Sequence, residues 1–232
     1  MDVQSPDAAR LPEVPGPVAA AVEHIFARLS AARGSRIFHP QGIAYRATLH
    51  VESGLDGVGL LAPGTSHDTV VRFSRGLGLP RGAREFLGLA LQIGDEQDVL
   101  LASSARAPLV RMIPLPVQSF FGATLTSLLP FDAGPRVVFV GAQANGAPTG
   151  ERDQLDELAA SGTVNVTFAA AELGGPWRPF GRLELDERLS EEAAQALRFD
   201  AWRCAGGLVP HGRINALRGP AYRGSRRGRP SG

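Results

Sequence analysis

The sequence contains no lysine, a single cysteine and no long uninterrupted apolar run. All 24 of its basic residues are arginine, so a P-loop, which needs a lysine after its glycines, is excluded. Cys204 alone forms neither an internal disulfide nor a multi-cysteine metal site, which predicts a reducing, cytoplasmic location. No stretch reaches the roughly 18 uncharged apolar residues of a membrane span, so no membrane partner is expected.

Charge gives little indication of a macromolecular partner. The formal net charge is only +1 over 232 residues, so the whole chain has no general attraction to nucleic acid. Residues 213–229 contain six arginines and no acid. This basic tail has no interleaved aromatic residues, and a nucleic-acid partner is therefore not predicted.

Short apolar and β-branched runs separated by glycine and proline dominate the middle of the chain. Because helical patterns are missing between most of these runs, they favour an antiparallel sheet or barrel over βαβ units. Strands are predicted at 44–51, 70–74, 89–93, 99–102, 136–142, 163–169 and 178–185. Helices are predicted at 15–34, 152–160 and 190–197 and from 214 onward.

We expect one α+β domain with an antiparallel β-barrel and flanking helices. Residues 1–34 would form an N-terminal segment and a helix that packs on the barrel, and residues 35–212 would form the barrel core. Residues 213–232 would form an arginine-rich C-terminal helix or tail. No linker-like stretch separates two cores.

Two polar pairs are candidates for site chemistry. Arg36 and His39 stand just before a predicted strand, where a proline and a glycine can aim a side chain into a cavity. Arg218 and Tyr222 would lie one turn apart on a C-terminal helix. A guanidinium beside a phenol stabilises the phenolate, which is the form that binds ferric iron.

Five pieces in a fixed order carry a resemblance to a known family. Together they resemble the haem-containing catalase-like superfamily, and above all its small bacterial members, over roughly half of the chain. The pieces are Arg36-x-x-His39-x-x-Gly42, Arg72-Phe73-Ser74-x-Gly76-x-Gly78, Arg84-x-x-x-Gly88-x-Ala90-x-x-Ile93, Asp98-Val99-Leu100 and Arg218-x-x-x-Tyr222.

The resemblance implies a haem b cofactor and a site for it. His39 would be the distal acid and base, and Tyr222 the proximal ligand of the iron, with Arg218 lowering its pKa. Arg36 and Arg72 would bind the haem propionates. The reaction implied is peroxidase turnover of hydrogen peroxide or an organic hydroperoxide, with a small-molecule reductant as the second partner.

Two further residues, Phe73 and Ser103, complete this set. Phe73 would line the haem pocket, although a core position predicts the same residue. The distal asparagine of catalases has no evident counterpart, and a hydroxyl, that of Ser103, follows Asp98-Val99-Leu100-Leu101 instead. Pro40 follows His39 where the family more usually has alanine.

An alternative from another class stays open at this point. A haem-free relative could keep the barrel as a small-molecule binding module or scaffold, in which Tyr222 only anchors the C-terminal segment. A two-histidine phosphodiesterase is excluded, because its His-x-Thr unit occurs only once, at His67. These residues are compatible with a homo-oligomer and do not define one.

Overall fold

The computed structural model describes residues 41–80, 82–147, 154–161 and 164–212. The predicted helices at 15–34 and from 214 onward lie outside these residues, as do the expected boundaries of the barrel core at 35 and the start of the tail at 213.

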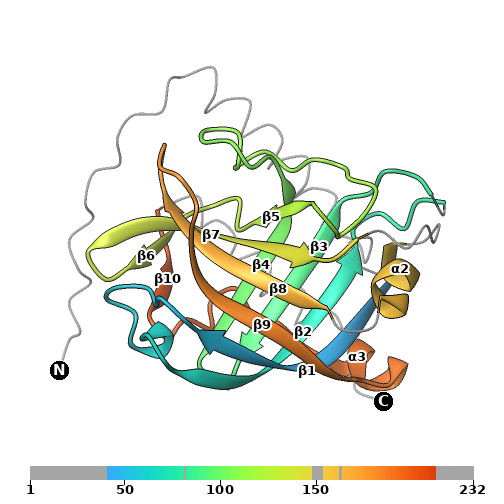
Figure 1. Cartoon of the computed structure of the whole chain (residues 1–232), viewed down its shortest axis with the longest axis horizontal. Coiled ribbons are helices and arrows are strands. Elements are labelled where there is room, and N and C mark those ends of the chain that lie inside the picture. Colours follow the sequence, from blue (N-terminus) through green and yellow to red (C-terminus); the bar gives the residue numbers. More distant parts are fainter. Residues whose placement is uncertain (1–40, 81, 148–153, 162–163, 213–232) are drawn as a thin grey trace, which may run out of the picture.

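Eight antiparallel strands close into a barrel (Figure 1). The order around it is β7-β5-β4-β3-β2-β1-β9-β8, and pairing of β8 with β7 closes the ring. In chain order these strands are β1 (Gln41–Val51), β2 (Ser66–Arg75), β3 (Leu87–Ile93), β4 (Gln97–Ser104), β5 (Thr124–Thr126), β7 (Arg136–Asn145), β8 (Asn165–Glu172) and β9 (Arg178–Arg188). The predicted antiparallel barrel is therefore confirmed, and each predicted strand has a counterpart.

The remaining elements are short. The strands β6 (Phe131–Ala133) and β10 (Leu208–Pro210) extend the sheet beyond β7, with β10 at its edge. Helices in the described residues are η2 (Gly59–Leu61), α2 (Gln154–Ala160) and α3 (Glu191–Ala196). The described part is thus mostly β, and the predicted α+β class is corrected accordingly. None of its helices has the length and apolar character needed to cross a membrane.

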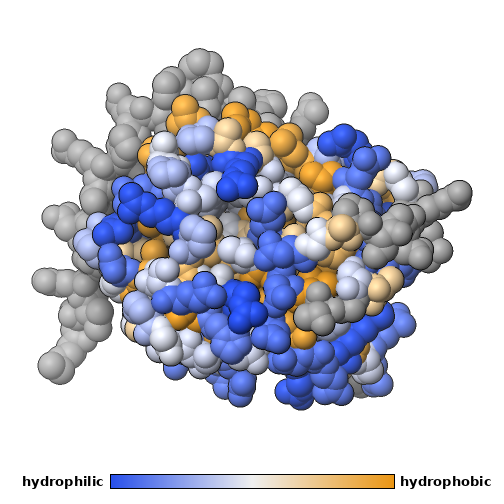
Figure 2. All heavy atoms as spheres, viewed as in Figure 1, coloured by the Kyte–Doolittle hydropathy of each residue, from blue (hydrophilic) through white to orange (hydrophobic). Residues whose placement is uncertain are grey.

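Side chains alternate between the barrel interior and the outside, which is the period-two pattern of a half-buried strand. Along β3 the buried positions include Leu87, Leu89, Leu91 and Ile93, while Ala90 and Gln92 are partly exposed. Figure 2 shows hydrophilic residues over much of one face of the molecule, with apolar residues along its upper edge and in smaller groups between them.

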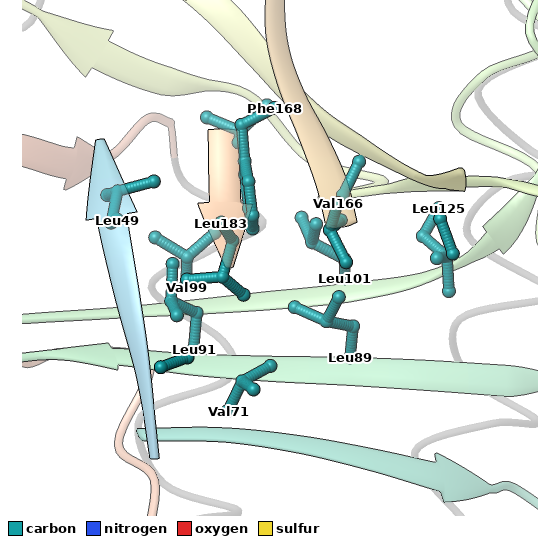
Figure 3. Packing of buried hydrophobic residues seen from close by; sticks show 14 of the residues in the cluster. Leu49, Val71, Leu89, Leu91, Val99, Leu101, Leu125, Val166, Phe168 and Leu183 are labelled. Carbon is teal, nitrogen blue, oxygen red and sulfur yellow. The ribbon is translucent and has the colours of Figure 1, made fainter. Parts of the chain in front are cut away.

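The interior of the barrel is filled by apolar side chains (Figure 3). Residues from strands on all sides meet there, so the barrel is a packed core. Those labelled are Leu49, Val71, Leu89, Leu91, Val99, Leu101, Leu125, Val166, Phe168 and Leu183. A ligand larger than a few atoms must therefore bind at an end of the barrel or on its surface.

One end of the barrel carries α2 and α3, the α-helices of the described residues (Figure 1). Gln41 pairs with Arg75, so the start of β1 and the end of β2 lie at this end together. Helix α2 packs against β2, and α3 packs against β1. The Ser190 side chain caps α3 by accepting a hydrogen bond from the Ala193 N–H at 3.2 Å, as its place before two glutamates predicts.

Candidate functional site

A cavity of about 770 Å³ lies at this helical end of the barrel. Its walls come from the start of β1, the end of β2 with the loop that follows, α2, and the segment from the end of β9 into α3. The apolar part of the lining includes Ile43, Leu79, Leu155 and Leu189. This volume is in the range of small-molecule and cofactor sites.

Three arginines of the described residues line the cavity: Arg72 and Arg75 on β2 and Arg188 at the end of β9. Arg72 stands beside Gly42, where a Cβ would lie 2.6 Å from the Arg72 Cζ and 2.7 Å from the Phe73 carbonyl oxygen. Only glycine leaves room for the guanidinium against the β1 backbone. Burial lowers the pKa of Arg72, yet a guanidinium remains protonated at neutral pH. The cavity wall therefore carries a partly desolvated positive charge.

Two acids face the same space, Asp156 on α2 and Glu191 on α3. Three arginines against two carboxylates leave the described part of the lining with one excess positive charge. A ligand with carboxylate or phosphate groups at one edge suits the arginine wall, because guanidinium groups bind such groups through paired hydrogen bonds.

The loop from Gly76 to Pro80, which forms part of the cavity wall, is fixed by a buried carboxylate. Glu85 has 0% of its surface exposed. Its carboxylate accepts hydrogen bonds from the N–H groups of Leu77 at 3.0 Å, Leu79 at 2.9 Å and Phe86 at 2.9 Å. The Arg75 guanidinium also donates to the Leu79 carbonyl. These hydrogen bonds fix this wall of the cavity to Arg75 and Glu85.

The structure separates the predicted site residues that it describes. Arg72 lines the cavity, whereas Phe73 is fully buried and packs edge-on against Tyr45 and Phe120, with ring centroids 6.3 and 5.3 Å away. Phe73 is thus part of the core, and the cavity lining does not include it.

Ser103 is also fully buried. Its hydroxyl donates to the Leu115 carbonyl at 2.6 Å and accepts from the Leu87 N–H at 3.0 Å. These bonds tie β4 to the loop after it and to β3. Ser103 is absent from the cavity lining, and its catalytic role stays a prediction.

The other predicted site residues, Arg36, His39, Arg218 and Tyr222, lie outside the described residues. The strand β1 begins at Gln41, two positions after His39 in the sequence, and its next residues line the cavity. Tyr45, the one tyrosine within the described residues, has a pKa raised by burial in spite of the nearby Arg188 charge. It is therefore a neutral phenol, unsuited to binding iron.

Within the described ranges, no cluster of three or more histidine, cysteine or acidic side chains is arranged to hold a metal ion. Sequence reasoning identified Arg72 and missed Arg75, Arg188 and Glu85 as parts of the site. Arg188 could not be identified because it is the last residue of β9, far along the chain, and only the barrel topology brings it beside β1.

Comparison with solved structures places this fold among the catalases. The chain matches catalase A from Saccharomyces cerevisiae with a TM-score of 0.57 at 11% identity, over 97% of this chain and 67% of that one. A fungal catalase matches with a TM-score of 0.54 at 13% identity, covering 90% of this chain and 63% of that one. A bacterial catalase matches with a TM-score of 0.56 at 14% identity, covering 97% and 63%.

The chain therefore has a catalase-like fold and spans about two thirds of the length of these catalases. No protein-family model matches the sequence, and no curated protein matches it. At these identities the likeness concerns the arrangement of the barrel, and a cofactor or a reaction needs its own argument from the residues.

Proposed function

We propose that the cavity at the helical end of the barrel binds haem b and that the protein is a haem-dependent peroxidase related to the catalases. The observation that carries this proposal is the arginine wall, formed by Arg72, Arg75 and Arg188, on a catalase-like barrel. Haem b presents two carboxylates at one edge of a flat apolar ring. The cavity offers guanidinium groups together with apolar residues such as Ile43 and Leu189.

The described residues fit the carboxylate edge of haem. Arg72 would donate to one propionate, because Gly42 keeps its guanidinium in place and burial strengthens its charge-assisted hydrogen bonds. When bound, haem would supply the redox chemistry of its iron. The ligand of that iron comes from outside the described residues, where the family resemblance suggests Tyr222 with Arg218 beside it.

The remaining roles also follow the resemblance. His39 would take a proton from the peroxide and return it to the leaving oxygen, as a neutral imidazole does in general acid–base catalysis. Arg36 would bind a second propionate. A hydroperoxide and a small-molecule reductant would be the two substrates.

The absorption spectrum of the protein reconstituted with haemin tests the proposal. We expect a Soret band in the wild-type protein, and its growth during a titration with haemin measures the affinity for haem. Arg72→Gln should bind haemin at least tenfold more weakly than the wild type, since a hydrogen bond to a charged group contributes about 1.5–3 kcal/mol. Arg46→Gln is the matched control, because Arg46 is an exposed arginine on the neighbouring strand β1. Equal affinities in these two variants would contradict the assignment of Arg72.

Two variants outside the described residues test the chemistry. Tyr222→Phe should shift or abolish the Soret band, and His39→Ala should keep the band and lose peroxide turnover. Undiminished peroxide turnover in His39→Ala would contradict the assignment of His39 as the distal base.

The alternative function is a haem-free module that binds a small anionic molecule in the same cavity. It is favoured by the described cavity lining, in which Arg72, Arg75 and Arg188 can donate charge-assisted hydrogen bonds to an anion. A protein that gives no Soret band after reconstitution would support this alternative and reject the peroxidase.

A further inference from the structure

Arg111, on the loop between β4 and β5, is a buried cation that does not line the cavity described above. Its surface is 0% exposed. Its backbone carbonyl accepts hydrogen bonds from the hydroxyl groups of Ser104 at 2.8 Å and Thr126 at 2.6 Å, which fix the residue against the barrel. Burial lowers the pKa of Arg111, but a guanidinium keeps its proton at neutral pH. The loop therefore holds a permanent positive charge beneath the surface.

Two aromatic rings cover this guanidinium. The centroid of the Trp177 ring lies 4.5 Å from the Arg111 Cζ, and that of Phe139 lies 5.8 Å away. Trp177 is fixed in turn, because its indole N–H donates to the Arg106 carbonyl at 2.8 Å and its ring lies on Gly141, where a Cβ would be 2.7 Å from it. Cation–π attraction stabilises the charge. It does not satisfy N–H groups that point along the plane of the guanidinium.

The hydrogen bonds of Arg111 are incomplete. Its Nη2 donates to the Gly175 carbonyl at 2.6 Å, while Nε and Nη1 are buried with no hydrogen-bond partner. No carboxylate of the described residues pairs with it; the ion pairs there use other arginines, such as Arg136 and Arg203. A buried charged donor left without a partner is strongly destabilising, so this position calls for an anion.

We infer that Arg111 binds a small monoanion, a halide such as chloride or a carboxylate of formate size, between its loop and the turn that follows β8. Arg111 lines neither the 770 Å³ cavity nor the small cavity beside Trp202, so this site is separate from both. Nε and Nη1 would donate to it. Trp177, which covers the guanidinium, is itself only half-buried.

Thermal unfolding in a series of chloride concentrations tests the site. Gluconate, which is too large to enter, replaces the omitted chloride so that the ionic strength stays constant. The melting temperature of the wild-type protein should rise by about 5 °C over two decades of chloride concentration. Arg111→Met should lose this dependence. Arg178→Met, an exposed arginine next to Trp177, is the control and should retain it. The same series with formate distinguishes two kinds of site. Formate should raise the melting temperature more than chloride at a carboxylate site, and less than chloride at a halide site.

A second measurement needs no change at Arg111. Crystals grown with bromide should show an anomalous scattering peak within hydrogen-bond distance of Nε or Nη1. In solution, Trp202→Phe leaves Trp177 as the only tryptophan, and iodide should quench its fluorescence saturably. Three results together would overturn the inference. These are a water molecule at Arg111 in place of bromide, linear quenching by iodide, and a melting temperature that does not depend on chloride or formate.

Discussion

Gly42→Ala is the sharpest test of how the cavity is built. A methyl group at this position would lie 2.6 Å from the Arg72 Cζ and Nη2 and 2.7 Å from the Phe73 carbonyl oxygen. Ordinary van der Waals contact is well above 3 Å, and the Phe73 oxygen belongs to the backbone of the neighbouring strand, which cannot swing aside as a side chain can. Overpacking of this kind costs about 1–3 kcal/mol.

The assay is urea unfolding followed by fluorescence, with the free energy extrapolated to water. Gly59→Ala is the matched control, because nothing lies within 4 Å of its added Cβ. Its effect should be near zero or slightly stabilising, since alanine restricts the unfolded chain. In Gly42→Ala the Arg72 guanidinium must also move, so the affinity for an anionic ligand should fall together with stability. Equal unfolding free energies in the two variants would refute the close packing of Arg72 against β1.

Three further outcomes follow from buried groups. Glu85→Gln should lower the free energy of unfolding by about 2–3 kcal/mol, since an amide cannot accept all three backbone N–H bonds; exposed Glu187→Gln is its control in urea unfolding. Burial raises the pKa of Asp98 in spite of the Asp200 N–H and Arg203, so the folded state retains its proton more strongly than the unfolded chain. The wild type should therefore lose stability relative to Asp98→Asn as pH rises from about 4 through the folded pKa, and parallel pH profiles would contradict this. Burial also raises the pKa of the Cys204 thiol, which predicts slower reaction with a disulfide reagent at pH 7 than in the urea-unfolded protein; equal rates would disprove it.

The sequence was most informative where side chains alternate along a strand. The long strands were predictable because residues such as Leu89 and Leu91 recur at every second position. The strands β5, β6 and β10 have three residues each, which is too short for any periodicity. Their pairing depends on neighbouring strands far away in the sequence.

The candidate site was predictable only in part, for a related reason. Arg72 stands in a strand motif and was identified, whereas Arg188 reaches the cavity through the pairing of β9 with β1. Glu85 acts through bonds to backbone N–H groups, for which the sequence has no distinctive pattern. The sequence fits a core and a pocket interpretation of Phe73 equally, and its contacts with Tyr45 and Phe120 show that it packs in the core. Its role beside a haem stays a prediction.

Closure of the barrel between β7 and β8 also bears on how the protein behaves when it is concentrated or stressed. A closed ring leaves few unpaired backbone groups on which another chain could add a strand. Among the described strands, β10 stands at the edge of the sheet, and it is three residues long and ends in Pro210, which has no N–H to donate. Aggregation through strand addition should therefore require the β7–β8 seam to open first. An engineered disulfide across that seam would protect the protein against aggregation even where it left the melting temperature unchanged.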